Sequence, residues 1–226
     1  MSTDLQRLAQ IDFSDSLGES GADMPWCCYL SECSPLAGRE HGRNNYAAWL
    51  GSEQASQKGL YIWLHELPGN QRFRFIHVGL SKRGKSTLAS RTRAHCRNAF
   101  TKDPTYLLSV QGDGFGCLER IPQRDCDAKG VNPDAAKRFL DQIRVLLMIP
   151  PCGEHEEAIA RMEGLIAHAA ALALGEIQIT NTMDRVQPPQ DCAKLRHLVK
   201  RLNAVVPMLP EVNQNSPHSA PCGQSG

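Results

Sequence analysis

The sequence predicts an α/β (α+β) fold in which a small central β-sheet begins with a β-hairpin and is flanked by helices. Residues 60–64 and 73–78 are rich in aromatic and β-branched side chains, and residues 67–71 between them favour a turn. This combination is typical of a β-hairpin. Residues 143–149 form another apolar run that ends at two prolines, which indicates a further strand. The remaining candidates are a strand over residues 105–110 and, as an alternative start to the last strand, a helix within 133–147.

Three helices are expected around these strands. The first begins at a cap over residues 86–87 and ends near residue 98, and the last covers residues 192–202. The middle helix spans about residues 154–174, and its core-facing residues recur at helical spacing: Ile159, Met162, Ile166, Ala169 and Ala173. Glu163 lies beside this apolar stripe, where a carboxylate is desolvated unless it is paired or binds a cation.

The expected domain spans residues 56–187, with an extension on either side. In residues 1–55, a short amphipathic start (Leu5, Leu8 and Ile11) and many Gly, Ser and Pro residues indicate irregular structure with one or two helices. Residues 188–226 are expected to hold the last helix and a disordered tail, because prolines and polar residues fill its end.

The composition is that of an ordinary globular protein, with 41% hydrophobic and 22% charged residues in a chain of 226. No apolar run approaches the roughly 18 residues that span a bilayer, and no secretory signal is visible, so we expect no membrane partner and a cytoplasmic location. The nine cysteines are odd in number and lack C-x-x-C spacing, which argues against a disulfide framework and a zinc ribbon.

The net charge of +1 hides a strongly basic segment. Between Arg72 and Arg97 there is no acidic residue, and eight are basic: Arg72, Arg74, Lys82, Arg83, Lys85, Arg91, Arg93 and Arg97. Such a cluster predicts contact with a polyanion such as DNA, because cations that bind phosphates release counterions. A solvated basic face explains the charge alone equally well.

Two pairs of residues are expected to share a surface. If the hairpin is centred on Gly69, Tyr61 lies directly opposite His77 on one face of the sheet. Arg91 and His95 are four residues apart on the first helix and therefore lie on one of its faces.

Four short segments follow one another along the chain in a distinctive order. They are Gly59-Leu60-Tyr61, His77-Val78-Gly79, Leu88-Ala89-Ser90-Arg91-Thr92-Arg93-Ala94-His95 and Ala160-Arg161-Met162-Glu163-Gly164-Leu165-Ile166, with Asn181 after them. Together they resemble the GIY-YIG nuclease superfamily, whose domain begins with a hairpin bearing two tripeptides, continues with an Arg-bearing helix and ends with a Glu-bearing helix. The resemblance covers residues 59–181, and the order and spacing of the segments carry it.

The resemblance implies a metal-dependent endonuclease that hydrolyses phosphodiester bonds of DNA. Tyr61 would act as the general base or position the water, and Arg91 would brace the phosphate with its planar guanidinium. His95 would contact the phosphate from the same helix face. Glu163 would hold one divalent cation, Mg²⁺ or alternatively Mn²⁺, which binds oxygen ligands and keeps several waters. The supporting residues would be Gly59, Gly79, Lys82 and Asn181, with DNA contacts from Arg83, Lys85, Arg93 and Arg97.

The sequence departs from the family at two positions. His77 stands where the second tripeptide usually has tyrosine, and Leu80 replaces a lysine that often follows its glycine. Histidine exchanges a proton near neutral pH, so either Tyr61 or His77 is a candidate for the base. Lys82 is a candidate substitute for the missing lysine.

A competing motif occupies the same residues. The segment from Gly79 to Ser86 fits G-x-x-x-x-G-K-[ST], a phosphate-binding P-loop, between a predicted strand and a predicted helix. In that interpretation the chain is a nucleotide-binding NTPase or kinase, with Lys85 on the terminal phosphates and Ser86 on Mg²⁺. It leaves Arg91 and Glu163 unexplained, so we favour the nuclease.

A third interpretation is a non-catalytic nucleic-acid-binding domain of the same fold. Such a domain would be expected to have lost Arg91 or Glu163, and both are present. The sequence does not specify which DNA is cut or in which process. A homodimer is the arrangement expected of a nuclease of this size that cuts both strands.

Overall fold

The computed structural model describes residues 5–12, 25–35, 48–69, 71–82, 84–98, 141–151, 156–174 and 192–210. Their centre is a five-stranded antiparallel sheet in the order β1-β2-β5-β3-β4. The strands are β1 (Leu5–Ile11), β2 (Trp26–Ser31), β3 (Gly59–Leu67), β4 (Arg72–Ser81) and β5 (Ile143–Ile149). The predicted α+β class, with a hairpin-containing sheet between helices, is therefore confirmed.

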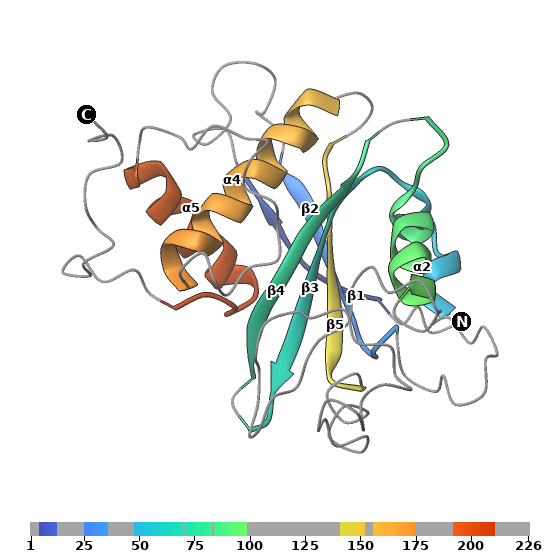
Figure 1. The fold of residues 1–226 in the computed structure, drawn as a ribbon, viewed down its shortest axis with the longest axis horizontal. Helices are drawn as coiled ribbons and strands as arrows, with labels where there is room; N and C mark the ends of the chain where they lie inside the picture. Colours follow the sequence, from blue (N-terminus) through green and yellow to red (C-terminus); the bar gives the residue numbers. More distant parts are fainter. Residues whose placement is uncertain are drawn as a thin grey trace.

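Helices cover both faces of this sheet (Figure 1). The α-helices are α2 (Leu88–Asn98), α4 (Glu156–Leu174) and α5 (Cys192–Val205), and two 3₁₀ turns, η1 (Ala48–Gly51) and η2 (Gln54–Ser56), precede the hairpin. One core, here the α4–α5 core, joins these two helices to Leu60, Ile62 and Leu64 of β3. The other, the α2 core, joins α2 to the alternate β3 residues Tyr61 and Trp63. Because successive residues of a strand point to opposite faces, α2 and α4 lie on opposite sides of the sheet.

The amino-acid composition of the two neighbouring strands β3 and β5 explains why they lie inside the sheet. Strands β3 and β5 consist almost entirely of apolar residues, and nearly all of them are buried because both faces of the sheet are covered. The prediction of a strand over residues 143–149 is confirmed with the same bounds. The predicted strand over residues 105–110 lies outside the described residues.

The β3–β4 hairpin corrects the expected register. Tyr61 pairs with Gly79, and the residue opposite His77 is Trp63. The turn is centred half a residue later than Gly69, and a β-bulge near Ile76 adds one more residue to β4. The two shifts together move the register by two residues. A two-residue shift preserves the face, so Tyr61 and His77 still lie on the same side of the sheet.

The N-terminal segment also differs from the expectation. Residues Leu5–Ile11 form an edge strand paired with β2, where the spacing of Leu5, Leu8 and Ile11 suggested an amphipathic helix. The register shifts between Arg7 and Ala9, which leaves Leu8 in a bulge. Leu5 consequently packs in the α2 core and Ile11 in the α4–α5 core. A spacing of three residues thus arises from a bulged strand and mimics helical periodicity.

The helices begin and end close to where the sequence places them. Helix α2 ends at Asn98 as expected, and α4 buries Ile159, Met162, Ile166 and Ala169 as predicted, with Ala173 half-buried against the same core. Helix α5 is three residues longer than expected and ends at Val205.

The segment that follows α5 is packed, in contrast to the disordered tail expected there. Val206, Met208 and Leu209 are buried in the α4–α5 core. The Asn203 side chain closes this turn: its Oδ1 accepts hydrogen bonds from the backbone N–H groups of Met208 and Leu209, and its Nδ2 donates to the Leu209 carbonyl. Residues 206–210, the C-terminal strap, also contact β4, because the N–H of Phe73 donates to the Pro207 carbonyl.

Asn203→Ala is expected to lower the free energy of unfolding by about 2–3 kcal/mol, because it leaves backbone groups of a packed turn without partners. Urea denaturation monitored by circular dichroism measures this change. Lys200→Ala, which removes an exposed side chain from the same helix, is the matched control and should change stability by less than about 0.5 kcal/mol. Equal effects of the two substitutions would show that the Asn203 contacts do not hold the strap.

Candidate active site

The glycines of the two tripeptides lie at one end of the hairpin, and each has a structural reason. A Cβ atom built on Gly59 would stand 2.3 Å from the carbonyl oxygen of Met148 on β5. On Gly79, a Cβ atom would stand 2.2 Å from the Tyr61 hydroxyl oxygen and 2.3 Å from Cζ of the same ring. Gly59 therefore permits close approach of two backbones, and Gly79 permits the Tyr61 ring to lie across β4.

Tyr61 and His77 lie close together on the face of the sheet that α2 covers. Their ring centroids are 6.2 Å apart and the rings are tilted by 45°. Tyr61 is only 1% exposed, whereas His77 is half-buried. The predicted proximity of the two side chains is confirmed, although they are diagonal rather than direct neighbours.

Helix α2 is held over this face by its N-terminal residues. The Thr87 Oγ1 accepts a hydrogen bond from the N–H of Ser90, and the Ser90 Oγ accepts one from the N–H of Thr87, a reciprocal cap. The N–H of Leu88 donates to the carbonyl of Gln57, which ties the helix to the chain just before β3. Leu88 and Ala89 are buried, so the helix turns Arg91 and Arg93 to solvent.

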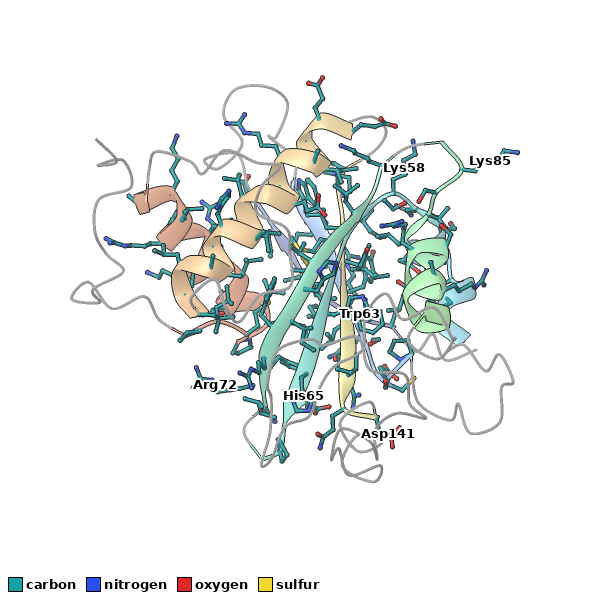
Figure 2. The ribbon with its side chains drawn as sticks, in the orientation of Figure 1. Lys58, Trp63, His65, Arg72, Lys85 and Asp141 are labelled. Atoms are coloured by element: carbon teal, nitrogen blue, oxygen red, sulfur yellow. The ribbon has the colours of Figure 1, made fainter. Side chains whose placement is uncertain are left out.

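The basic loop before α2 is short. Ser81 donates from its hydroxyl to the Ser86 hydroxyl at 3.2 Å, and Gly84 adopts the left-handed conformation with φ +56°. Lys82 is half-buried and Lys85 is exposed. Figure 2 shows Lys85 and Lys58 at the end of the molecule opposite His65, Arg72 and Asp141.

This geometry does not support the phosphate-binding loop of the competing motif. Gly79, Leu80 and Ser81 belong to β4 and pair with Tyr61, Leu60 and Gly59, so the first part of the motif is strand. The sheet around it is antiparallel throughout. P-loops instead wrap phosphates with a continuous loop between a strand and a helix N-terminus, typically in a parallel sheet.

Glu163 occupies a different layer from the other site residues. It lies on α4, which covers the face of the sheet opposite α2, and its side chain is half-buried beside the apolar stripe. The first turn of α4 is anchored at the tripeptide end of the hairpin by an ion pair between Lys58 and Glu156, with Nζ and Oε1 3.4 Å apart. The structure therefore groups Tyr61, His77 and the helix of Arg91 and places Glu163 across the sheet.

The side chains of four residues selected from the sequence are not described. His95 and Arg97 belong to α2, but their side chains are not described, and Arg83 and Asn181 are outside the described ranges.

Two residues of this region were not predicted from the sequence. Trp63 is the direct partner of His77 and is buried in the α2 core. Thr92 is fully buried on α2, and its hydroxyl has no hydrogen-bond partner among the described residues. The spacing of Leu88 and Thr92, four residues apart on one face of the helix, was the signal that could have identified the buried face.

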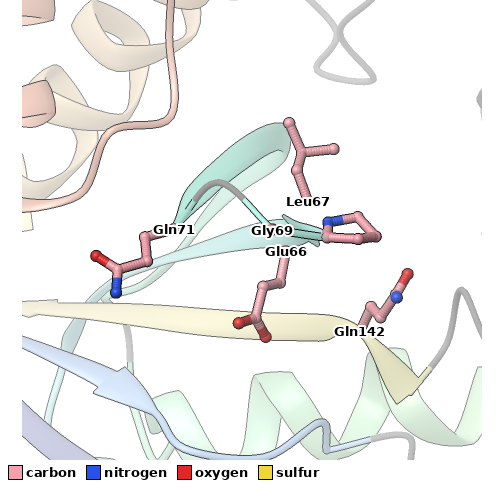
Figure 3. A pocket seen from close by; sticks show the side chains of 6 residues that line it. Glu66, Leu67, Gly69, Gln71 and Gln142 are labelled. Carbon is pink, nitrogen blue, oxygen red and sulfur yellow. The ribbon is translucent and has the colours of Figure 1, made fainter.

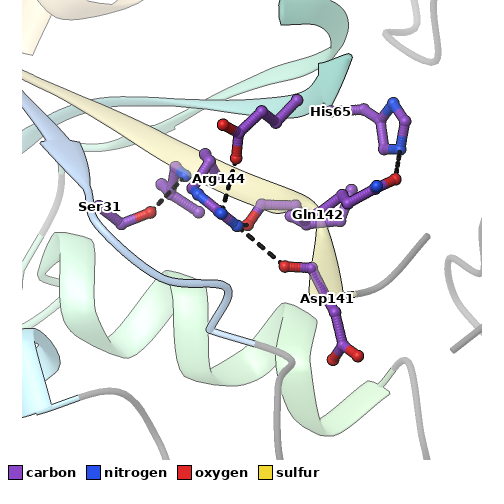
Figure 4. A network of polar contacts seen from close by, with 8 residues as sticks. Ser31, His65, Asp141, Gln142 and Arg144 are labelled. Carbon is purple, nitrogen blue, oxygen red and sulfur yellow. Dashed lines mark hydrogen bonds and ion pairs between the residues drawn. The ribbon is translucent and has the colours of Figure 1, made fainter. Parts of the chain in front are cut away.

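A separate polar cluster lies at the other end of the hairpin. A pocket of about 360 Å³ there is lined by Glu66, Leu67, Pro68, Gly69, Gln71 and Gln142 (Figure 3). Beside it, Arg144 pairs with Glu66 at 2.6 Å and donates to the Asp141 carbonyl (Figure 4). His65 Nε2 lies 3.0 Å from Oε1 of Gln142. This cluster holds the ends of β3 and β5 together, and it lies away from the tripeptide glycines.

His65 should make the fold sensitive to acid. Burial, together with the nearby cations Arg74 and Arg144, lowers the pKa of His65 to about 4 from 6.5, against the hydrogen bond with Gln142. Between pH 6.5 and 4 the unfolded chain takes up a proton that the folded chain does not, so acidification favours unfolding. The free energy of unfolding therefore falls by about 3 kcal/mol between neutral pH and pH 4.

His65→Gln is expected to flatten this part of the pH dependence of stability, measured by urea denaturation at pH 7, 5.5 and 4.5. His197→Gln, at an exposed position of α5, should leave the wild-type pH dependence intact. An unchanged slope in His65→Gln would show that other groups cause the acid sensitivity.

The described cysteines do not form a metal centre. Cys27, Cys28 and Cys33 are free thiols, as expected, and burial raises the pKa of Cys28 to about 12, so that thiol stays protonated. Within the described ranges, no group of three His, Cys, Asp or Glu side chains is placed to hold a metal ion. Nor is any described helix both long and apolar enough to cross a bilayer.

No protein-family model, curated protein or solved structure matches the chain.

Proposed function

We propose that the protein is a metal-dependent endonuclease that hydrolyses DNA phosphodiester bonds with a GIY-YIG-type site. The observation that carries the proposal is the layer formed by α2 over the hairpin. That helix has no acidic residue, turns Arg91 and Arg93 to solvent and covers the face on which Tyr61 and His77 meet. A guanidinium on the same side of the sheet as two side chains that can exchange protons would supply two of the functions that phosphodiester hydrolysis needs.

The DNA backbone would lie along the end of the molecule that carries the tripeptide glycines. Lys85 and the exposed arginines of α2 supply the cations there, and phosphates are bound by cations independently of base sequence. Strand β4 is the last strand of the sheet, and α2 and α4 each contact it. The C-terminal strap contacts that side at Phe73, toward the hairpin turn, and the tripeptide residues lie at the opposite end.

In this proposal Arg91 stabilises the charge that builds on the phosphate, and Tyr61 or His77 accepts the proton of the attacking water. Glu163 would hold Mg²⁺ or Mn²⁺. A half-buried carboxylate on a helix fits a hard cation that keeps most of its waters. When bound, such a cation neutralises phosphate charge and stabilises the departing oxygen.

A non-catalytic nucleic-acid-binding domain is the second candidate, and two observations favour it. Tyr61 is almost fully buried, and Glu163 lies in the helix layer on the other side of the sheet from Arg91. A domain that only binds DNA needs the basic surface of α2 and no metal ligand. Cleavage in the presence of a divalent cation separates the two candidates.

The test is incubation of the purified chain with supercoiled plasmid, single-stranded and branched DNA in Mg²⁺, Mn²⁺ or EDTA, followed by sequencing of the ends. The proposal expects metal-dependent nicks or breaks. Binding of these DNAs without any cleavage would favour the second candidate, and neither binding nor cleavage would reject both.

The nucleotide-binding alternative has a separate test. If the segment from Gly79 to Ser86 held a nucleotide, the protein would bind ATP or GTP, and Lys85→Ala would abolish that binding. We expect no nucleotide binding, because the first three of the eight motif residues are paired strand. We also propose a cytoplasmic location for the protein. If it cuts both strands of a duplex, we expect it to act as a homodimer.

A further inference from the structure

We propose that His77, rather than Tyr61, is the general base of the candidate active site. This assignment rests on the proposed nuclease function and deepens it. It is carried by the difference in exposure and surroundings of two side chains that share one face of the hairpin.

The Tyr61 hydroxyl is enclosed on several sides. The ring lies over Gly79, so closely that a Cβ atom there would stand 2.2 Å from the hydroxyl oxygen. The side chain is 1% exposed and belongs to the α2 core with Leu88 and Ala89. A general base must come within about 3 Å of the proton that it accepts, or reach it through one water. In the structure the buried hydroxyl of Tyr61 does not meet this requirement.

The side chain of His77 is more accessible to solvent than that of Tyr61. It lies on β4, the last strand of the sheet, and its side chain is half-buried at the margin of the α2 layer. The ring of Tyr61 is 6.2 Å away, centroid to centroid, and the indole-bearing Trp63 is its direct partner on β3. These neighbours flank the imidazole, which is half-buried on the face of the sheet that α2 covers.

Charged and titratable groups from several elements lie on this side of the sheet. They are Tyr61 and His65 on β3, Arg74 on β4, Arg91 and Arg93 on α2, and Glu53 beside η2. Three of these six groups are arginines, and Glu53 is the one acid among them. A neutral imidazole can accept a proton near neutral pH, where a phenol is still protonated.

In the proposed step a lone pair of the water oxygen forms the new P–O bond while one water proton passes to the unprotonated ring nitrogen of His77. The P–O bond to the leaving sugar oxygen breaks with its electron pair, and that oxygen takes a proton from solvent. Tyr61 is then a positioning residue that fills the space over Gly79 and supports the imidazole.

Four variants of the full chain, assayed for DNA cleavage in Mg²⁺, test the assignment. His77→Phe is expected to lower kcat by roughly 10²–10⁴-fold, the usual contribution of a general base, whereas Tyr61→Phe, which keeps the ring that supports the imidazole, should lose at least about tenfold less activity than His77→Phe. His77→Tyr should retain activity with the acid limb of its pH profile moved upward by about 3.5 pH units, because phenol titrates near pH 10 and imidazole near 6.5. Added imidazole should restore part of the activity of His77→Ala.

The outcomes separate this assignment from the nuclease proposal itself. If the wild-type chain cleaves DNA but Tyr61→Phe, folded by circular dichroism, loses as much activity as His77→Phe, the assignment is wrong and the nuclease proposal stands. The same conclusion follows if His77→Tyr keeps the wild-type pH profile and imidazole rescues nothing. If wild type cleaves no DNA under any of these conditions, the nuclease proposal fails first.

Discussion

Gly59→Ala is expected to lower the free energy of unfolding by about 3 kcal/mol or more, or to prevent folding. Gly59 has φ +155°, a conformation that side-chain-bearing residues rarely adopt, and a Cβ atom would stand 2.3 Å from the Met148 carbonyl oxygen. The obstacle is backbone in the middle of the sheet, so a side-chain rotation cannot relieve it. Separation of β3 from β5 would weaken both cores that these strands share.

Urea denaturation measures this loss, with Gly51→Ala as the matched control. Gly51 lies at the end of η1, and a Cβ atom there would meet nothing within 4 Å. The control should therefore change stability by less than about 1 kcal/mol. A Gly59→Ala variant as stable as wild type would mean that β3 and β5 are not paired as described at Met148.

Arg91→Ala is expected to lower kcat for DNA cleavage by roughly 10²–10³-fold, the usual loss when one group that stabilises transition-state charge is removed. Arg93 provides an unusually close control, because it lies two residues away on the same helix and is also exposed. Arg93→Ala should leave kcat nearly unchanged, weaken DNA binding at all sequences and reduce the slope of affinity against salt concentration by about one.

The comparison of the two variants decides whether α2 contributes chemistry or only charge. Cleavage assays at saturating DNA give kcat, and binding measured over a range of salt concentrations gives the electrostatic contribution. If both variants lose only affinity and to the same extent, α2 is a basic binding surface, and the second candidate function gains support.

Much of the fold could be predicted from the sequence because several of its patterns are local. The hairpin was predictable from two β-rich segments around a turn, and β5 from an apolar run bounded by prolines. The helical stripe of α4 was predictable because its core face follows a 3.6-residue period. The cap of α2 required only a threonine and a serine three residues apart.

The errors arose where one residue changes a pattern or where partners are distant in sequence. A bulge at Leu8 gives β1 the spacing of a helix, and another near Ile76 moves the hairpin register. The sequence of the C-terminal strap predicts a polar, proline-containing tail. It is ordered by contacts of Asn203, Met208 and Leu209 that composition does not reveal.

For the candidate site, the sequence placed Tyr61 and His77 together but did not reveal the layer of Glu163. Helical periodicity identifies which side of a helix is buried, whereas the connection from β5 to α4 decides which face of the sheet that helix covers. Glu163 therefore joins α5 in one layer, and Arg91 lies in the other. The burial of the Tyr61 side chain could not be predicted from the sequence either, because it depends on the close approach of the ring to Gly79 in the neighbouring strand.

The metal dependence of plasmid cleavage by wild type and by Glu163→Gln tests the nuclease proposal most directly. Glu157→Gln, an exposed glutamate in the first turn of the same helix, is the matched control. We predict cleavage by wild type and Glu157→Gln in Mg²⁺ but not in EDTA, and a loss of at least roughly 100-fold in Glu163→Gln with unchanged metal-free DNA binding. Full activity in Glu163→Gln, or no metal-dependent cleavage by the wild-type chain, would contradict it.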